Sequence, residues 1–163
     1  MRWRRWLLAI AGYLVVAGIV GLSAATGWFY WDRVQTRGEQ AARAVLPGLA
    51  AREVPEVFAY DYQTVERSLA QAYPLLTPDY RQEFQKSANT QIIPEAKKRE
   101  VVVQANVVGV GVMSAKRDSA SVMVYMNRTV TDKTRQPLYD GSRLRVDFKK
   151  IGGKWLIAYI TPI

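Results

Sequence analysis

The clearest feature of the hydrophobic pattern is a long apolar stretch near the start of the chain. From Leu7 to Trp31, 25 consecutive positions carry no charged residue. At about 1.5 Å per residue, a helix of that length exceeds the roughly 30 Å hydrocarbon core of a bilayer. We therefore predict one membrane-spanning helix over residues 7–31. Aromatic residues flank it, as they do at membrane interfaces: Trp3, Trp6, Trp28, Phe29, Tyr30 and Trp31.

The charges on either side of this stretch predict its orientation. Arg2, Arg4 and Arg5 precede it, whereas Asp32 and Arg33 follow it and nearly cancel. By the positive-inside rule, residues 1–6 are expected in the cytoplasm and the rest of the chain on the exoplasmic side of the plasma membrane. A cleaved signal peptide is the competing interpretation, because small residues near position 24 resemble a cleavage site. The length of the stretch favours a retained span.

Small residues form a stripe on the predicted span. Ala17, Gly21 and Ala25 recur at intervals of four, and Gly18 lies beside them. Such a stripe allows another membrane helix to approach closely, so these four residues are candidates for helix docking. Gly and Ala are also common in membrane helices that do not pack, which is the alternative. The span carries no charge, so nothing supports ion or proton conduction.

Helical patterns continue after the span. Residues 32–47 contain many charged, good helix formers and predict a stalk that continues the membrane helix until Pro47-Gly48 ends it. A second helix is expected at about 50–61. Because 163 residues allow one compact domain plus an appendage, residues 48–163 are expected to form a single exoplasmic domain.

Two further helices have sharper signals. A helix over about 65–75 is predicted after Thr64 as N-cap, because apolar residues recur there at helical spacing. They are Val65, Leu69, Ala72 and Leu76. Thr77-Pro78-Asp79 combines a cap residue, a proline at the first helical position and an early acid, which predicts the next helix start. On that helix one face carries Tyr80, Phe84 and Ala88.

After Pro94 the apolar pattern changes from the helical period to the period of two that is typical of strands. In the third of the predicted strands Leu144, Val146 and Phe148 alternate with polar residues, so one side packs on a core. Gly152-Gly153 predicts a two-residue hairpin turn, because both glycines can adopt positive φ. The predicted strands are Val101 to Met113, Ser121 to Thr131, Ser142 to Ile151 and Lys154 to Ile160.

Helices followed by a four-stranded antiparallel meander define an α+β fold class. Three to four helices are expected to cover one face of a long, curved sheet, which makes a cone. Asp132 to Gly141 is expected to be a surface loop. The residues predicted to fill the core, or their register partners, are Val101, Val103, Val122, Val124, Leu144, Val146, Trp155 and Ile157.

The amino-acid composition excludes the most common catalytic mechanisms. The chain has no Cys and no His, which excludes histidine-based nucleophile systems, thiolate metal sites and disulfides. We therefore expect no metal, no cofactor and no enzymatic activity. The formal charge is +9, but basic and acidic residues are interleaved after the span, and the densest cluster is Lys97-Lys98-Arg99. Nucleic-acid binding usually requires a concentrated basic face, so no nucleic-acid partner is expected.

Several short motifs, in a fixed order over residues 32–163, make the chain resemble the Mce-associated membrane proteins of mycobacteria and related actinobacteria. Pro78 differs from the glycine that is more common in that family. The motifs are Tyr60-Asp61-Tyr62-Gln63-Thr64-Val65, Leu76-Thr77-Pro78-Asp79-Tyr80, the Pro94-Glu95-Ala96 turn, Val124-Tyr125-Met126-Asn127, Gly141-Ser142-Arg143-Leu144-Arg145-Val146, Gly153-Lys154-Trp155-Leu156-Ile157 and Thr161-Pro162-Ile163.

This resemblance implies an NTF2-like (cystatin-like) cone and a non-catalytic, stabilising role in an Mce-type complex that imports lipids, sterols or fatty acids. The implied partners are the permease helices and substrate-channel proteins of the Mce transporter, together with the lipid bilayer. Direct lipid binding inside the cone is a further possibility. It requires an apolar cavity, and a cone filled by Trp155, Phe84 and Leu69 would exclude it.

Two other functions remain open. VirB8-type assembly factors of type IV secretion share the plan of one span and an NTF2-like domain. NTF2-like cones elsewhere house isomerases and dehydratases, and Tyr60, Asp61 and Tyr62 together offer a carboxylate base and a tyrosine donor. Catalysis would require Asp61 in an apolar pocket with a raised pKa. The simpler interpretation is that Asp61 binds backbone N–H groups at a helix end.

One exposed strand face is a candidate partner surface. Arg143, Arg145 and Asp147 alternate with the apolar residues of the third strand. The alternative is an ordinary solvated sheet face whose charges pair along the strand.

Overall fold

The computed structural model describes residue 3 and residues 36–163. The predicted span and its docking candidates Ala17, Gly18, Gly21 and Ala25 lie outside the described residues. Among the residues that the structure describes, no helix combines the length and hydropathy needed to cross a membrane.

The first helix runs without interruption over residues 36–58. The predicted break at Pro47-Gly48 and the separate helix at about 50–61 are therefore wrong. A proline inside a helix costs about 3 kcal/mol, but burial of apolar side chains contributes roughly 1.5–3 kcal/mol each. The helix has an apolar stripe that continues through the proline and is buried along its whole length, which outweighs that cost. The stripe consists of Ala42, Leu46, Ala50, Val54 and Val57.

The next two helices confirm the sequence patterns. Helix α2 spans Val65–Ala72 and continues into a 3-10 turn, η1, at Tyr73–Leu75. Helix α3 spans Pro78–Ser87, with Pro78 in its first turn. Thr64 occupies the N-cap position of α2, but its side chain makes no capping hydrogen bond. The predicted stripe is buried: Val65, Leu69, Ala72 and Leu76.

A further helix lies where the sequence analysis placed only a turn. After the π-helical segment η2 at Ala88–Ile92, helix α4 spans Ile93–Arg99 and ends at Glu100 in the left-handed conformation. The Pro94-Glu95-Ala96 motif is its first part. Pro94 has no N–H to donate, and it directly follows the π-helical segment, where the α-helical bonding pattern is already interrupted.

The sheet has five antiparallel strands in the order β1-β2-β3-β4-β5. The four predicted strands are confirmed, although each is longer than predicted. Gly152 and Gly153 form the turn between β4 and β5 with φ of 57° and 82°. A two-residue strand, β1, was not predicted. The bounds are β1 Tyr60–Asp61, β2 Val102–Ala115, β3 Ser119–Thr131, β4 Leu138–Ile151 and β5 Lys154–Pro162.

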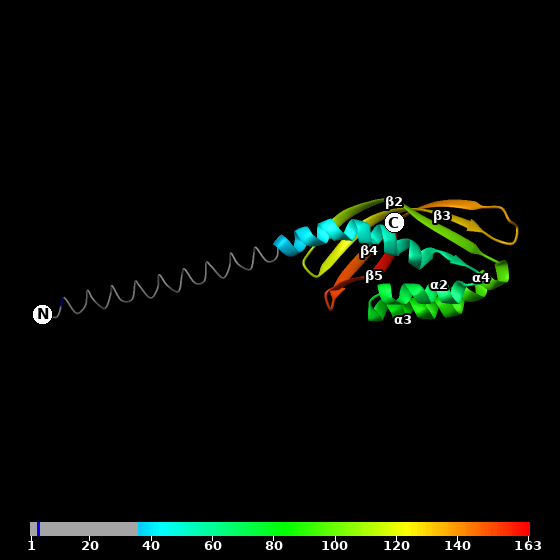
Figure 1. Cartoon of the computed structure of the whole chain (residues 1–163), viewed down its shortest axis with the longest axis horizontal. Helices are drawn as coiled ribbons and strands as arrows, with labels where there is room; N and C mark the ends of the chain where they lie inside the picture. The colour runs from blue at the N-terminus through cyan, green and yellow to red at the C-terminus, as the bar shows by residue number, and fades with distance from the viewer. Residues whose placement is uncertain (1–2, 4–35) are drawn as a thin grey trace. The chain divides into compact units, whose positions relative to one another are not determined.

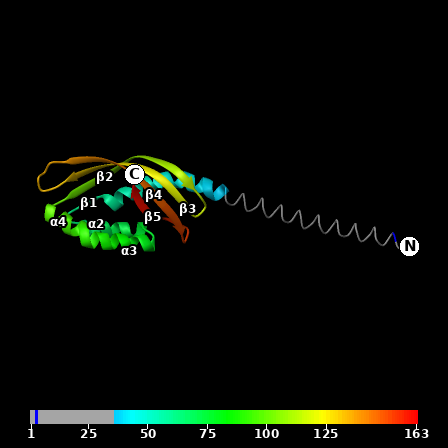
Figure 2. The ribbon, with the colours of Figure 1, turned by 180° about the vertical axis from the view of Figure 1, so that it is seen from behind.

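All the helices lie on the concave side of the curved sheet (Figures 1 and 2). The first helix packs its buried stripe against inward residues of β3 and β4, such as Val124 and Val146. Helices α2 and α4 pack against the start of β2 at Val101 and Val103. The α+β arrangement and the predicted core are confirmed except at Trp155, which is half-buried under the ammonium group of Lys150.

Candidate functional site

A cavity of about 410 Å³ opens between the helices and one end of the sheet. We call it the cone cavity. Its wall combines residues from the end of the first helix, from β1, from α2 to α4, and from the parts of β2 and β3 that face them. The lining residues are Val57, Phe58, Tyr60, Leu69, Tyr80, Phe84, Ile92, Glu95, Arg99, Val101, Val103, Arg128 and Val130.

The helical wall of the cavity follows from the apolar face of α3. Tyr80 and Phe84 are one turn apart on that helix, with ring centroids separated by 6.5 Å. Tyr73 meets the edge of Phe84 from the preceding turn at 6.2 Å. Burial raises the pKa of Tyr60 and of Tyr80, so both phenols are protonated at neutral pH. They contribute an apolar ring and a polar tip.

One partly buried cation lies among the apolar residues of the wall. Arg128, on β3, places its guanidinium 5.9 Å from the centre of the Phe58 ring. Its Nη2 forms an ion pair with Asp140 on β4. This bond, together with a hydrogen bond from Ser142, lowers the pKa of Asp140. The Nε of Arg128 is buried and finds no acceptor among the described residues. Such an unpartnered buried donor is unusual in a folded protein.

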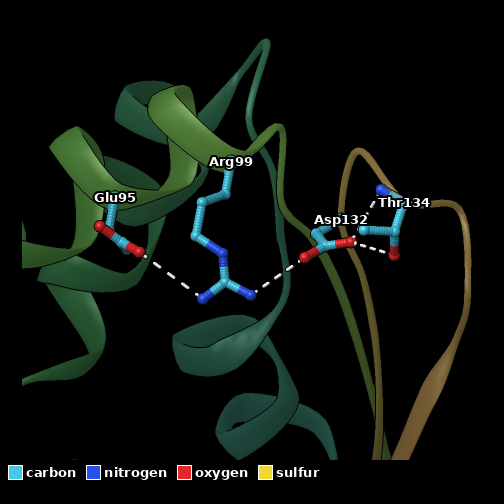
Figure 3. A network of polar contacts seen from close by, with 4 residues as sticks. All are labelled: Glu95, Arg99, Asp132 and Thr134. Carbon is cyan, nitrogen blue, oxygen red and sulfur yellow. Dashed lines mark hydrogen bonds and ion pairs between the residues drawn. The ribbon is translucent and has the colours of Figure 1, made fainter.

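A second cation lies at the rim (Figure 3). Arg99, near the end of α4, contacts Glu95 at 3.5 Å and Asp132 at 3.0 Å. Asp132 begins the loop between β3 and β4 and accepts bonds from the hydroxyl of Thr134 at 2.6 Å and its backbone N–H at 2.9 Å. Those bonds, joined by Arg99, lower the pKa of Asp132 to about 2. The network therefore ties α4 to this loop.

Replacing Asp132 with asparagine should reduce stability at neutral pH but not in strong acid. The folded state holds the pKa of Asp132 at about 2 against an ordinary 3.8. The ionised carboxylate therefore stabilises the fold above pH 3.8, and this contribution disappears as the pH falls from 3.8 to about 2. Melting temperatures of both chains, measured by circular dichroism across that window, should converge at its acidic end.

The control for this experiment is Asp118→Asn, an exposed carboxyl with no side-chain hydrogen bond among the described residues. It should leave the melting temperature nearly unchanged at every pH. A constant gap between the Asp132→Asn variant and the parent chain through the acid window would contradict the assigned role of the network.

The structure separates the three residues considered for catalysis. Tyr60 lines the cone cavity, but Asp61 and Tyr62 are not among its lining residues. The carboxylate of Asp61 instead accepts the backbone N–H of Gln63 at 2.9 Å and holds the turn before α2. This contact agrees with the simpler interpretation of Asp61 drawn from the sequence, in which its carboxylate binds backbone N–H groups at a helix end. The placement argues against a carboxylate and tyrosine pair acting on a bound substrate.

The charged strand face lies on the other side of the sheet from the core. Arg145 pairs with Asp147 through Nε at 3.1 Å, and Ser121 donates a hydrogen bond to the same carboxylate. Arg143 is exposed and forms no ion pair among the described residues. The charges thus pair along the strand in part, and binding of a partner by this face stays a prediction.

Two residues of the basic cluster Lys97-Lys98-Arg99, at the end of α4, form ion pairs within the domain. Lys97 pairs with Glu66 on α2 at 2.7 Å, and Arg99 belongs to the rim network. Within the described part of the chain, no group of metal-ligating side chains is arranged to hold a metal ion. Phe58, Arg99 and Arg128 were not predicted as site residues from the sequence. The only available signal was Arg128 itself, a cation beside the apolar positions of β3.

The described domain has an α+β fold of the type seen in VirB8 proteins. An IcmL-like type IV secretion system protein from Legionella pneumophila matches with a TM-score of 0.63 and 15% identity, over 74% of this chain and 93% of that one. The VirB8 protein of Agrobacterium tumefaciens matches with a TM-score of 0.54 and 13% identity, over 68% of this chain and 84% of that one. At such low identity these similarities establish the fold alone.

A family model described as "Uncharacterized protein Rv1363c/MT1408-like" matches residues 7–160, and the chain belongs to this family. A relative from Mycobacterium tuberculosis, named "Outer membrane protein Rv1973", is 27% identical over 158 residues. The match covers 97% of this chain and 99% of the relative. The similarity to mycobacterial proteins therefore extends over nearly the whole chain.

Proposed function

We propose that the protein is a non-catalytic membrane subunit that helps to assemble or stabilise a multi-protein complex of the cell envelope, as a VirB8-type subunit does. The observation that carries this proposal is the similarity of the described domain to a type IV secretion protein over 93% of the solved chain of that protein. The predicted single span before the domain supports the same plan. In this plan the span anchors the subunit and the cone contacts other subunits.

The side chains available to the domain support a non-catalytic role. The whole sequence lacks His and Cys, the residues that most often supply a base or a nucleophile near neutral pH. The carboxylate nearest to the tyrosines of the proposed enzyme site, Asp61, holds a turn instead. The charged groups in the cone cavity are Glu95, Arg99 and Arg128. Arg99 and Arg128 already pair with carboxylates.

We place the domain on the exoplasmic side of the plasma membrane. A 25-residue apolar stretch suits a helix through a bilayer, and the arginines before it favour a cytoplasmic N-terminus. The M. tuberculosis relative carries the name "outer membrane protein", so fractionation of the two membranes of a mycobacterial cell is a direct test. Recovery of this chain with the outer membrane would contradict our placement.

A second candidate is an accessory role in an Mce-type lipid importer. The ordered motifs that resemble Mce-associated proteins favour it, because they recur through most of residues 60–163. The cone cavity is compatible with this role, since the cone is not filled by Phe84 and Leu69, which instead line an opening of about 410 Å³. The two candidates differ in the complex that is joined and agree on a stabilising subunit.

The test is purification of the tagged full chain from native membranes in mild detergent, with identification of the proteins that accompany it. We expect subunits of one envelope complex. Secretion components would support the VirB8-type role, whereas permease and substrate-channel proteins would support the Mce role. A chain that is recovered alone, under conditions that keep other membrane complexes intact, would contradict both.

A matched pair of variants tests the membrane contact. Gly21→Leu enlarges a residue in the middle of the small-residue stripe and should greatly reduce the recovery of partners. Gly12→Leu makes the same change nine positions earlier, which is about two and a half helical turns and thus the opposite side of the predicted helix. It should leave recovery unchanged. Equal effects of the two variants would contradict docking through the stripe.

A further inference from the structure

The cone cavity has the size and lining of a small-molecule site. Its volume of about 410 Å³ lies within the range of about 300–1,000 Å³ that is usual for ligand pockets. Eight of its thirteen lining residues are aliphatic or phenylalanine, and two more are tyrosines. A molecule in contact with most of this wall must be largely apolar.

The remaining three lining side chains are charged, and they decide the polarity of the other end of that molecule. Arg99 and Arg128 carry positive charge and Glu95 carries negative charge, so the wall has one net positive charge. Their carboxylate partners Asp132 and Asp140 are not lining residues. Each of these partners offsets the charge of the arginine that it contacts. The feature that favours an oxygen acceptor at this wall is therefore the free hydrogen-bond donor of Arg128.

The guanidinium of Arg128 has N–H donors that find no acceptor among the described residues. Its hydrogen bonding among the described residues is limited to the bond from Nη2 to Asp140, while a guanidinium has five N–H donors. The buried Nε lacks an acceptor there. The positive charge also reaches the Tyr60 hydroxyl, where it partly offsets the rise in pKa that burial causes. An oxygen acceptor at this point would satisfy the buried donor, which is unfavourable without a partner.

We infer that the cone cavity binds an aliphatic monocarboxylate, with the hydrocarbon chain against the apolar and aromatic wall and the carboxylate on the guanidinium of Arg128. Arg128 is the specificity residue because a carboxylate pairs with guanidinium far better than an alcohol or an ammonium group does. Phe58 holds the guanidinium from one face, and Asp140 keeps it oriented from β4.

The test uses the full chain in lipid nanodiscs with a decanoate that carries a photoreactive diazirine. After illumination, mass spectrometry should locate the label in peptides that contain Val57, Tyr80 or Phe84. Unlabelled decanoate should compete with the probe, and decanol should compete at least tenfold less effectively because it lacks the charge that Arg128 pairs with. Label confined to residues 7–31 would overturn the inference, as would equal competition by decanol.

Three variants separate ligand binding from folding. Arg128→Met should weaken decanoate competition about tenfold or more and remove its advantage over decanol. Val130→Phe should abolish the label by filling the cavity while all charges remain. Arg143→Met makes the same change as Arg128→Met on the exposed face of β4 and should behave like the parent chain. Unchanged labelling in Val130→Phe would overturn the inference even if Arg128→Met failed to fold.

Binding of the probe and membership of an envelope complex are independent. A chain that recovers its partners from native membranes but does not bind decanoate would support the proposed function and overturn the ligand. The reverse result would keep the ligand and overturn the assembly role.

Discussion

Leu46→Ala is expected to destabilise the domain by about 2–5 kcal/mol, although it lies in a segment that the sequence suggests is an exposed stalk. The side chain is 0% exposed and belongs to the main core together with Ala42 and Ala50. The substitution removes buried methyl groups and leaves a cavity that the surrounding sheet can only partly close. Denaturant unfolding of the full chain in micelles, followed by far-ultraviolet circular dichroism, measures the loss.

The neighbouring Val45 supplies the control. It is 52% exposed, so Val45→Ala should change stability by less than about 0.5 kcal/mol. If the two substitutions had equal effects, the first helix would not dock on the sheet before Pro47. In that case the sequence-based division between a stalk and a domain at Pro47-Gly48 would stand after all.

Phe148→Ala should be still more damaging, at about 3–5 kcal/mol. Phe148 is among the largest fully buried side chains and is 1% exposed. On β4 it pairs in register with Ala120 of β3 and Ile157 of β5. The small side chain of Ala120, directly opposite on β3, leaves room for the ring. Thermal or denaturant unfolding of the full chain measures this loss.

Two companion substitutions test the cause of that loss. Phe148→Leu keeps most of the apolar volume and should cost much less than Phe148→Ala. Lys149→Ala alters the next, exposed position on β4 and should be nearly neutral. A large effect of Lys149→Ala would show that the two faces of β4 are assigned in the wrong sense.

The rim network and the cone cavity connect stability with the proposed ligand. Arg99 both lines the cavity and holds the loop that begins at Asp132. Loss of that tie in acid should loosen the loop beside the opening, and protonation of Asp140 in acid should weaken the ion pair of Arg128 as well. The network at Asp132 therefore affects the rim, and Arg128 is the residue proposed to select the ligand.

Local patterns were sufficient for much of the fold. The alternation of Leu144, Val146 and Phe148 predicted the inward face of β4, and Gly152-Gly153 predicted the turn that follows. Both signals are contained within a few neighbouring residues, because side chains alternate along a strand and positive φ favours glycine. The helix start at Pro78 was predictable for the same reason.

Other elements depended on contacts that local patterns do not contain. The short strand β1 exists because Tyr60 and Asp61 pair with Val103 and Val102, some forty positions away. Helix α4 has only seven residues, too few to show a helical period. Isolated helices of such length are unstable in water, so this one depends on packing, with Ala96 buried in the second core cluster.

The sequence by itself determined the apolar stretch that predicts a span, the α+β order, and which faces of α2, α3 and the long strands are apolar. Only the tertiary structure decided that the first helix continues through Pro47, and that Phe58, Arg99 and Arg128 meet around a cavity. The physical reason is the separation along the chain over which each kind of interaction acts. Periodicity and turn preference act between near neighbours, whereas burial, an unpartnered donor and an unfilled volume depend on side chains brought together from distant parts of the chain.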